Sequence, residues 1–419
     1  MQTMLLSFVL ATTLVSPVVA VVSSSPKTKR TKTLVIPPKF TKDFSRPMAI
    51  PEEGIEAANR IMRSGRLFRY SAVDAESSEV SQAEKEFATM VKQKYAVGVN
   101  SCSSAILLAM VTCGVEQGDQ VITNGFTFTA LPSTIMRLNA EPVLVEFTSS
   151  WTMDLDDLEA KAAANPKAKV LLLSHMRGKV VDMDRCVAIC EKHDLTLIED
   201  CAHACGIEWN GRQLGYHGKV AAYSTQSDKV INSGEGGFVT TDDDEIAAKL
   251  IYLSGAYERR YNKHAVYPPS EICEATMLSV PNLSCRMSEL TAAVLRPLIA
   301  NLPDRVLQYN RRYESCVDVM HKECPAYLVV PRQLEQVSSV GDHLNFYLRD
   351  VTEEQNAIFH ETITQMGVGA ASFMSPINAR YHKNWRKFGA PHYDLPQTDS
   401  VLRFAYDLKM PPYFEDDDF

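Results

Sequence analysis

The sequence predicts an α/β fold, with a mostly parallel sheet in a large domain and a smaller C-terminal α/β domain. From about residue 84 to residue 253, short apolar runs alternate with helix-like segments. That alternation predicts a largely parallel sheet with helices on both faces. At 419 residues the chain is long enough for two domains. Prolines 268, 269 and 281 interrupt the alternation and indicate a crossing into the second domain.

The expected elements follow in chain order, and no internal repeat separates them. In the large domain we expect strands at 95–99, 120–123, 142–146, 169–174, 196–199, 220–223 and 237–240, and helices at 103–113, 131–138, 156–164, 182–193 and 243–253. Beyond the prolines we expect helices at 286–298 and 306–319 and a strand at 344–349. The predicted domains are therefore residues 46–267, with an N-terminal arm, and residues 268–419, with an acidic tail.

The N-terminal 45 residues are predicted to be a targeting leader and a basic linker. No charged side chain occurs in the first 26 residues, and the apolar stretch Leu5 to Val22 ends near the small-residue pattern Val18-Val19-Ala20. This pattern predicts a secretory-type signal. An uncleaved anchor is the alternative, because 18 residues can span a bilayer. Residues 23–41 are basic and hydroxyl-rich, so a two-part organelle leader stays open as well.

Composition excludes some partners and suggests a compartment. With a net charge of -8, the chain offers no overall positive charge for binding nucleic acid. A membrane is expected as a partner only through an uncleaved leader. The ten cysteines are expected to be buried free thiols, so the mature protein is expected to be soluble in a compartment that keeps thiols reduced. The run Asp200 to Cys205 lacks the paired spacing of a structural zinc site, and no metal is expected.

Three features place candidate ligand groups at the ends of expected strands. Lys229 follows the strand at 220–223 and precedes a glycine-rich turn, and Asp200 ends the strand at 196–199. Open α/β sheets bind ligands at such strand ends. A hydroxyl-rich turn around Ser103 opens a helix, which is a typical anion site. An amine, an acid and a phosphate cradle are what pyridoxal 5'-phosphate (PLP) requires of a protein.

With these residues in view, the chain resembles the DegT-type sugar aminotransferases, which are PLP enzymes of the aspartate aminotransferase fold type I. The resemblance implies the three-layer fold of that type, and it runs from about Arg46 to Tyr413. The matching stretches are Ser64 to Arg66, Tyr95 to Ala105, Gly118 to Ile122, Phe126 to Ala130, Gly178 to Asp184, Glu199 to Gly206, Lys229 to Gly237 and Arg286 to Ala293.

The resemblance implies a role for each of eight residues. Lys229 would bind PLP as a Schiff base and move protons, and Asp200 would pair with the pyridine nitrogen. Phe128 would stack on the cofactor ring, and His203 would face its phenolic oxygen. The phosphate would be bound by Ser103, Ser104 and Ser224, and by Ser284 of the neighbouring subunit.

Simpler interpretations remain for several of these residues. Lys229 alone would be a solvated loop lysine, Asp200 would cap the following helix, and Phe128 and His203 would be packing residues. Two further residues are candidate substrate contacts. His175 follows the strand at 169–174, and Arg286 offers a bidentate fork to a carboxylate or phosphate, or else pairs with a structural acid.

The chain also departs from the pattern of these aminotransferases. Cys102 stands where glycine is usual, His203 where glutamine is frequent, and Ser284 where an asparagine reaches the phosphate of the neighbouring subunit. Met176 and Arg177 replace a more frequent Leu-Tyr pair. These departures concern the phosphate contact and the substrate side of the expected pocket.

The sequence therefore predicts a homodimeric PLP-dependent aminotransferase. It would move an amino group from glutamate or glutamine to a keto sugar, nucleotide-linked, or to a keto-cyclitol. Two alternatives stay open. One is a PLP-dependent sugar dehydratase of the same fold, which Lys229 disfavours because some such enzymes carry histidine there. The other is a catalytically idle PLP-binding regulatory protein.

Overall fold

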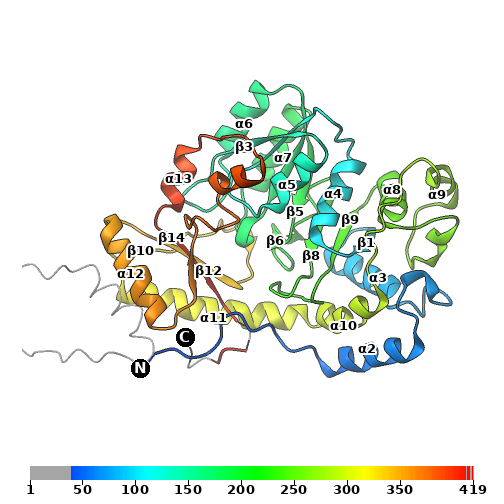
Figure 1. Ribbon diagram of the computed structural model, residues 1–419, viewed down its shortest axis with the longest axis horizontal. Coiled ribbons are helices and arrows are strands. Elements are labelled where there is room, and N and C mark those ends of the chain that lie inside the picture. Colours follow the sequence, from blue (N-terminus) through cyan, green and yellow to red (C-terminus); the bar gives the residue numbers. More distant parts are fainter. Residues whose placement is uncertain (1–38, 412, 416–417, 419) are drawn as a thin grey trace, which may run out of the picture.

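The computed structural model describes residues 39–411, 413–415 and 418, and the predicted signal at Leu5 to Val22 lies outside them. A seven-stranded sheet forms the centre, in the order β1-β9-β8-β5-β4-β2-β3 (Figure 1). Only β9 runs against the other six strands, so the predicted mostly parallel sheet is confirmed. The strands are β1 (Tyr95–Val99), β2 (Gln120–Asn124), β3 (Glu141–Val145), β4 (Ala168–Ser174), β5 (Thr196–Asp200), β8 (Val220–Ser224) and β9 (Gly237–Thr241).

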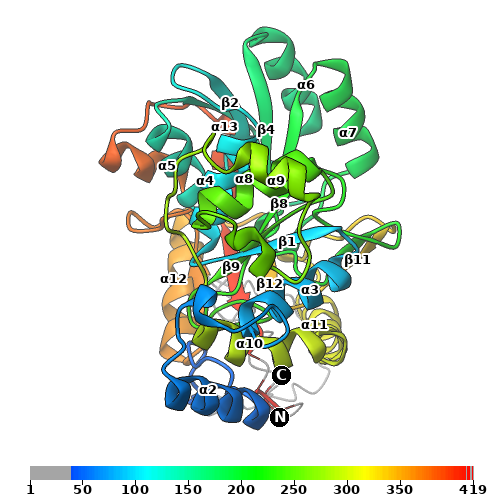
Figure 2. The same ribbon diagram turned by 90° about the vertical axis from the view of Figure 1, so that its right-hand side faces the viewer.

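Helices cover both faces of this sheet because its strands are apolar on both sides. Successive strand residues enter different cores: Leu171 and Leu197 face one, whereas Leu172 and Ile198 face the other. Figure 2 shows α8 and α9 in front of the sheet. One layer holds α4 (Cys102–Thr112), α5 (Ala130–Arg137), α8 (Asp244–Ser254) and α9 (Ser270–Thr276), and the other holds α3 (Glu79–Val91), α6 (Leu155–Ala164), α7 (Met183–Lys192) and α10 (Glu289–Ala300).

A second, four-stranded antiparallel sheet forms the smaller C-terminal part. Its order is β10-β12-β14-β13, and Phe346 of β12 stacks on Tyr406 of β14 with ring centroids 5.4 Å apart. Phe359 meets the Tyr406 ring edge-on, with centroids 5.2 Å apart. The elements are α11 (Leu302–Glu323), β10 (Leu328–Val329), β12 (His343–Leu348), α12 (Glu353–Gln365), β13 (Ala370–Ser372), η4 (His382–Phe388), α13 (Pro396–Leu402) and β14 (Ala405–Lys409). A small sheet, β11-β6-β7, joins β11 (Val337–Ser338) to β6 (Glu208–Trp209) and β7 (Arg212–Gln213).

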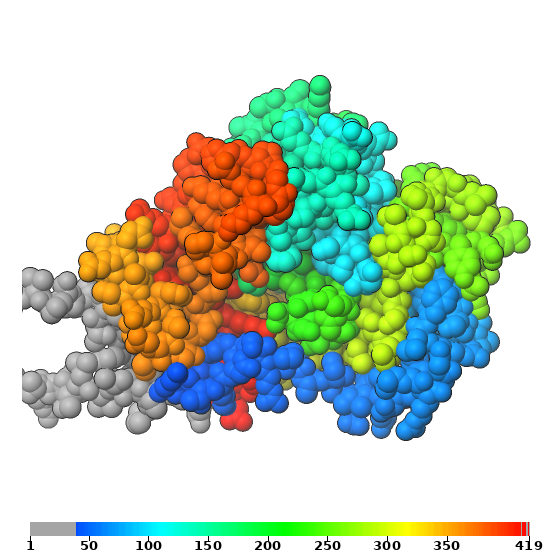
Figure 3. All heavy atoms as spheres, viewed as in Figure 1, coloured from blue at the N-terminus to red at the C-terminus, as the bar shows by residue number. Residues whose placement is uncertain are grey.

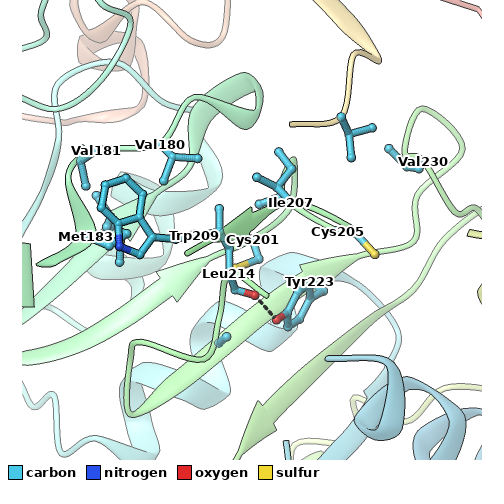
Figure 4. Packing of buried hydrophobic residues seen from close by; sticks show 14 of the residues in the cluster. Val180, Val181, Met183, Cys201, Cys205, Ile207, Trp209, Leu214, Tyr223 and Val230 are labelled. Atoms are coloured by element: carbon cyan, nitrogen blue, oxygen red, sulfur yellow. Dashed lines mark hydrogen bonds between the residues drawn. The ribbon is translucent and has the colours of Figure 1, made fainter. Parts of the chain in front are cut away.

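The hydrophobic core continues beneath the strand ends that carry the candidate ligand residues. Figure 4 shows Cys201 and Cys205 among its apolar side chains, close to Trp209 and Tyr223. The hydroxyl of Tyr223 donates to the carbonyl of Leu214 at 2.6 Å, so its polar atom is satisfied inside the core. All ten cysteines are free and seven are buried, which confirms the prediction of free thiols.

Most expected elements are present, with shifted ends. The helix expected from Arg286 begins at Glu289, because Ser288 caps it and Arg286 pairs with Val99 in an isolated bridge. The residues after Pro268 stay on the large sheet at first, since α9 packs on α8, and α10 packs on α3 and on α2 (Glu52–Ser64). The domain division at residue 268 stays a prediction.

The first described residues pack onto the C-terminal part of the chain. The backbone N–H of Phe40 donates to the carbonyl of Met366 at 2.8 Å. The rings of Phe40, Phe44 and Phe414 lie 5.0 to 5.2 Å apart, centroid to centroid. Residues 40–45, which the sequence assigns to the linker, therefore belong to the folded body. Among the described helices, none has the length and apolar character needed to cross a membrane.

Candidate active site

A cavity of about 910 Å³ opens at the carboxyl ends of β4, β5 and β8, between the large sheet and the C-terminal part. Figure 3 shows the hollow below the upper lobe, bordered by the orange C-terminal part and by the blue N-terminal segment. Each of the three strands ends in a residue that lines it: Ser174, Asp200 and Ser224. Its size suits a cofactor together with a small substrate.

Lys229 enters this cavity from the loop after β8. Its Nζ lies 3.1 Å from Nε2 of His203. The residues that follow Lys229 hold this loop in place. Val230 and Ile231 are buried in the core, and the guanidinium of Arg305 donates to the carbonyl of Val230 at 2.7 Å. Burial, followed by the positive charge of Arg177, lowers the pKa of Lys229 from 10.5 to about 8. A neutral, nucleophilic amine is thus accessible near neutral pH.

Asp200 is held at the end of the neighbouring strand by donors on both oxygens. Oδ2 accepts from the hydroxyl of Ser174 at 2.7 Å, and Oδ1 accepts from the backbone N–H of Ala202 at 3.1 Å. Burial raises the pKa of Asp200, while these two donors and the charge of Lys229 oppose that rise. A buried carboxylate fixed in this way favours a cationic partner in the cavity.

The start of α4, where an anion site is predicted, opens toward the cavity through Ser101, Cys102 and Ser103. The hydroxyl of Ser101 caps the helix by accepting from the N–H of Ser104 at 3.1 Å, and the first N–H groups of the helix lack intrahelical acceptors. The backbone at Gly237 lies very close to two neighbouring backbone segments. A Cβ on Gly237 would lie 2.4 Å from the carbonyl oxygen of Tyr223 and 3.1 Å from the nitrogen of Cys102. Only glycine fits at that position.

The predicted phosphate serines divide into two groups. Ser103 and Ser224 line the cavity. Ser104 does not line it, because its hydroxyl donates to Oδ1 of Asn100 at 2.7 Å within the helix cap. Ser284 also lies away from the cavity, where its hydroxyl donates to Oδ1 of Asn282 at 3.1 Å. The cavity lining therefore contains two of the four predicted serines.

Phe128 and His203 both line the cavity that contains Lys229. Phe128 is 43% exposed, which is a large fraction for an apolar ring, so a substantial part of its surface is accessible. His203 also lines the cavity, and its Nδ1 is buried without a hydrogen-bond partner. Burial, followed by the charge of Lys229, holds the pKa of His203 well below its ordinary value, so the ring is neutral.

Two predicted substrate contacts lie elsewhere. His175 is buried behind Asp200, and its Nε2 lies 2.9 Å from Oε2 of Glu199. The prediction that His175 touches substrate does not fit this position, because the ring forms an internal pair below the cavity floor. Arg286 donates to the carbonyl of Gly255 at 2.7 Å and lies outside the cavity.

His175, Glu199 and Cys201 also form a group of possible metal ligands within 4.8 Å. The oxygens of Glu199 accept from His175 and from the backbone N–H groups of Gly215 at 2.9 Å and Gly218 at 2.6 Å. The carboxylate is therefore satisfied by the protein itself, and the group anchors the β5 end.

Sequence reasoning missed the polar wall that the C-terminal part contributes. Arg177 pairs with Oδ2 of Asp407 at 2.6 Å and lies 2.9 Å from Nε2 of His343, and all three line the cavity. Arg177 has a left-handed backbone, with φ 55°, and its side chain links the end of β4 to the C-terminal part through Asp407. The departure from the family pattern at Met176 and Arg177 was the only sequence feature that pointed to this wall. The partners of Arg177 lie more than 150 residues away in the sequence, so no local pattern indicated them.

Comparison with known proteins identifies the fold and the family. The sequence matches the DegT/DnrJ/EryC1/StrS aminotransferase family over residues 49–419. The chain belongs to this family. Members and structural homologues of this aminotransferase family bind PLP, so the predicted enzyme class and fold type are confirmed.

Several members illustrate the similarity. The chain is 30% identical over 385 residues to the spore coat polysaccharide biosynthesis protein SpsC of Bacillus subtilis, covering 90% of this chain and 93% of that protein. It is 32% identical over 346 residues to the L-glutamine:2-deoxy-scyllo-inosose aminotransferase of Streptomyces kanamyceticus, covering 78% and 77%. The structure of an aminotransferase from Psychrobacter cryohalolentis superposes with a TM-score of 0.77 at 24% identity, covering 90% of this chain and 96% of that chain.

Proposed function

We propose that this protein binds PLP in the cavity and transfers an amino group from glutamate or glutamine to a keto sugar, nucleotide-linked, or to a keto-cyclitol. The observation that carries the proposal is the position of Lys229, which reaches the cavity beside His203 while Asp200 ends the adjacent strand. The helix start at Ser103, with Ser224 opposite, suits the phosphate. When bound, PLP supplies an electron sink for the amino-acid carbon.

The residues of the chain then have distinct tasks. Lys229, with its pKa near 8, is the amine that attaches the cofactor and moves the proton between carbon atoms. Asp200, fixed by Ser174, keeps the proton on the pyridine nitrogen. His203 is neutral and adjusts the hydrogen bonding of Lys229 and the phenolic oxygen. Phe128 packs on the ring face.

The acceptor class rests on the relatives. One similar enzyme is named for glutamine and a keto-cyclitol, and another for polysaccharide biosynthesis, so donor and acceptor of these classes are the first to test. Lys229 favours amino transfer over dehydration, because transfer needs a base that returns the proton to carbon. The direct test is to follow labelled nitrogen from glutamate or glutamine into a panel of keto sugar nucleotides and keto-cyclitols. Label in an amino sugar supports the proposal, and loss of water without label would favour the dehydratase.

A homodimer is part of the proposal. Ser284 is exposed and lies outside its own cavity, together with Arg286, whereas the family resemblance assigns this segment to the phosphate of the neighbouring subunit. Two-fold interfaces are the commonest arrangement among soluble homo-oligomers. A catalytically idle regulatory protein is the alternative, and a spectrum recorded with and without glutamate distinguishes it, because an idle protein keeps its cofactor spectrum unchanged.

The leader is proposed to direct the chain into a secretory or organelle route and to be removed. The packing of Phe40 and Phe44 limits the cleavage site, since the ring of Phe44 lies against Gly369 and the backbone of Phe40 lies against Gly367, and both glycines line the cavity. Cleavage is therefore expected before Phe40. Amino-terminal sequencing of the native protein tests this, and a mature end beyond Phe44 or an intact Met1 on soluble protein would contradict it.

A further inference from the structure

Residues 39–45, which we call the strap, form one side of the cavity that contains Lys229. Four consecutive strap residues line it, from Lys42 to Ser45. Figure 3 shows this blue segment along the lower border of the hollow. The match to the aminotransferase family begins at residue 49, after the strap. The strap is therefore a part of the cavity wall in which this chain can differ from other family members.

Two glycines of the C-terminal part make room for the strap. A Cβ on Gly367 would lie 2.1 Å from the carbonyl oxygen of Phe40, and a Cβ on Gly369 would lie 3.0 Å from the Phe44 ring. The rings of Phe40 and Phe44 both pack on Phe414, with centroids 5.2 and 5.0 Å away. These contacts fix the strap against the body of the protein, so the groups that it presents to the cavity have defined positions.

Asp43 is the strap residue with an open charged group. Its Oδ1 accepts from the backbone N–H of Ser45 at 2.8 Å and from the Ser45 hydroxyl at 2.6 Å, whereas no donor among the described residues bonds to Oδ2. The two bonds from Ser45 lower the pKa of Asp43, so the carboxylate is ionised at neutral pH. The neighbouring Lys42 pairs with Asp418 at 2.6 Å instead. Asp43 thus offers one free, ionised oxygen at the cavity.

A short series of charges joins Asp43 to the reacting lysine. The positive charge of Lys409 contributes to the low pKa of Asp43, and Lys409 donates to Oδ1 of Asp228 at 2.6 Å. Asp228 directly precedes Lys229, and all four residues line the same cavity. A molecule that extends from Lys229 along this wall therefore meets Asp43.

The charge of Asp43 selects the kind of group that binds there. A carboxylate accepts hydrogen bonds from hydroxyl groups, and these bonds are stronger than those between neutral partners. The same charge repels the carboxylates of an amino-acid donor and the phosphates of a nucleotide. The hydroxylated ring of the acceptor is therefore the part of the two substrates that suits Asp43.

We propose that Asp43 binds hydroxyl groups of the acceptor ring and so makes the strap a determinant of acceptor choice. The proposal rests on the proposed aminotransferase function. The acceptor ring then lies between Lys229, where its keto carbon reacts, and the strap, whereas the donor half of the reaction does not use Asp43.

The two half-reactions of the native PLP-bound enzyme separate acceptor from donor. Asp43→Asn keeps an oxygen for Ser45 and places an N–H donor where Oδ2 lies. Asp318→Asn is the matched control, because Asp318 is exposed on α11 and does not line the cavity. Single-turnover rates are measured with glutamine as donor, and with 2-deoxy-scyllo-inosose and a UDP-linked keto sugar as acceptors. We expect Asp43→Asn to slow the acceptor reaction on the order of 10- to 100-fold and to leave the glutamine reaction unchanged. Asp318→Asn should change neither rate.

Each other result decides against the proposal or isolates it from the enzyme class. A slower glutamine reaction with an unchanged acceptor reaction would mean that Asp43 accepts from the carboxamide of the donor, and the proposal would be wrong. Unchanged rates in both half-reactions would also overturn it. If the wild type performs neither half-reaction, the aminotransferase function fails separately, and saturation-transfer NMR with scyllo-inositol, an unreactive polyhydroxy ring, decides about Asp43. Wild type should bind this ring and Asp43→Asn should bind it about tenfold or more weakly; equal binding, or none by the wild type, would refute the hydroxyl site.

Discussion

Replacing Lys229 with methionine tests the electrostatics of the cavity without any substrate. The pKa of this lysine falls from 10.5 to about 8 on folding, mainly because of burial and Arg177. Such a difference corresponds to about 3 kcal/mol of destabilisation by the charged form. Lys229 is partly exposed, and water reduces the penalty, so we expect the cofactor-free Lys229→Met protein to be about 1 to 3 kcal/mol more stable than wild type at pH 7.

The predicted difference in unfolding free energy between wild type and Lys229→Met depends on pH. Between pH 8 and 10.5 the unfolded chain binds more protons at this lysine than the folded chain does, so wild-type stability rises with pH across that window. Below pH 8 the full penalty is present. The advantage of Lys229→Met should therefore be constant at pH 7 to 8 and disappear by about pH 10.5. Urea unfolding at fixed protein concentration measures it, with exposed Lys85→Met as the control. Equal stability of wild type and Lys229→Met throughout would refute this account of the buried amine.

The remaining predictions concern the catalytic groups and the assembly. Asp200→Asn should fold normally yet lower turnover by about 10²-fold or more, measured as kcat, and near-normal turnover would assign the acid role elsewhere. His203→Gln should keep activity within about tenfold while shifting the cofactor spectrum and its pH dependence; complete loss would make the histidine the working base. Analytical ultracentrifugation should show a dimer, and coexpressed Lys229→Ala and Arg286→Ala chains should recover roughly a quarter of wild-type activity through hybrid dimers. A fully active monomer would contradict both the dimer and the shared site.

The sequence predicted the features that depend on local order. Lys229 and Asp200 follow short apolar strands, and parallel strands bring their carboxyl ends to one edge of the sheet, so their meeting follows from topology. His175 also follows a strand, but its side chain points to the opposite face and pairs with Glu199. A single strand-end position does not distinguish these two faces without knowledge of the exact twist and turn.

The wall from the C-terminal part could not be predicted in the same way. Arg177 meets Asp407 across 230 residues, and no local pattern specifies such a pair. Arg380 sits in an irregular loop whose position depends on the bridge between Phe126 and Tyr381. The contact between Phe40 and Met366 could not be predicted from the sequence either, because the basic composition of the residues before it suggested a linker.

The central claim is that Lys229 attaches the cofactor, and borohydride reduction of the PLP-bound protein tests it most directly. Reduction fixes the pyridoxyl group on the lysine that holds it, and peptide mass spectrometry then identifies that residue. The account predicts one modified peptide containing Lys229, and loss of both the modification and the visible cofactor band in Lys229→Ala. A pyridoxyl group on any other lysine, or an unchanged band in Lys229→Ala, would contradict it.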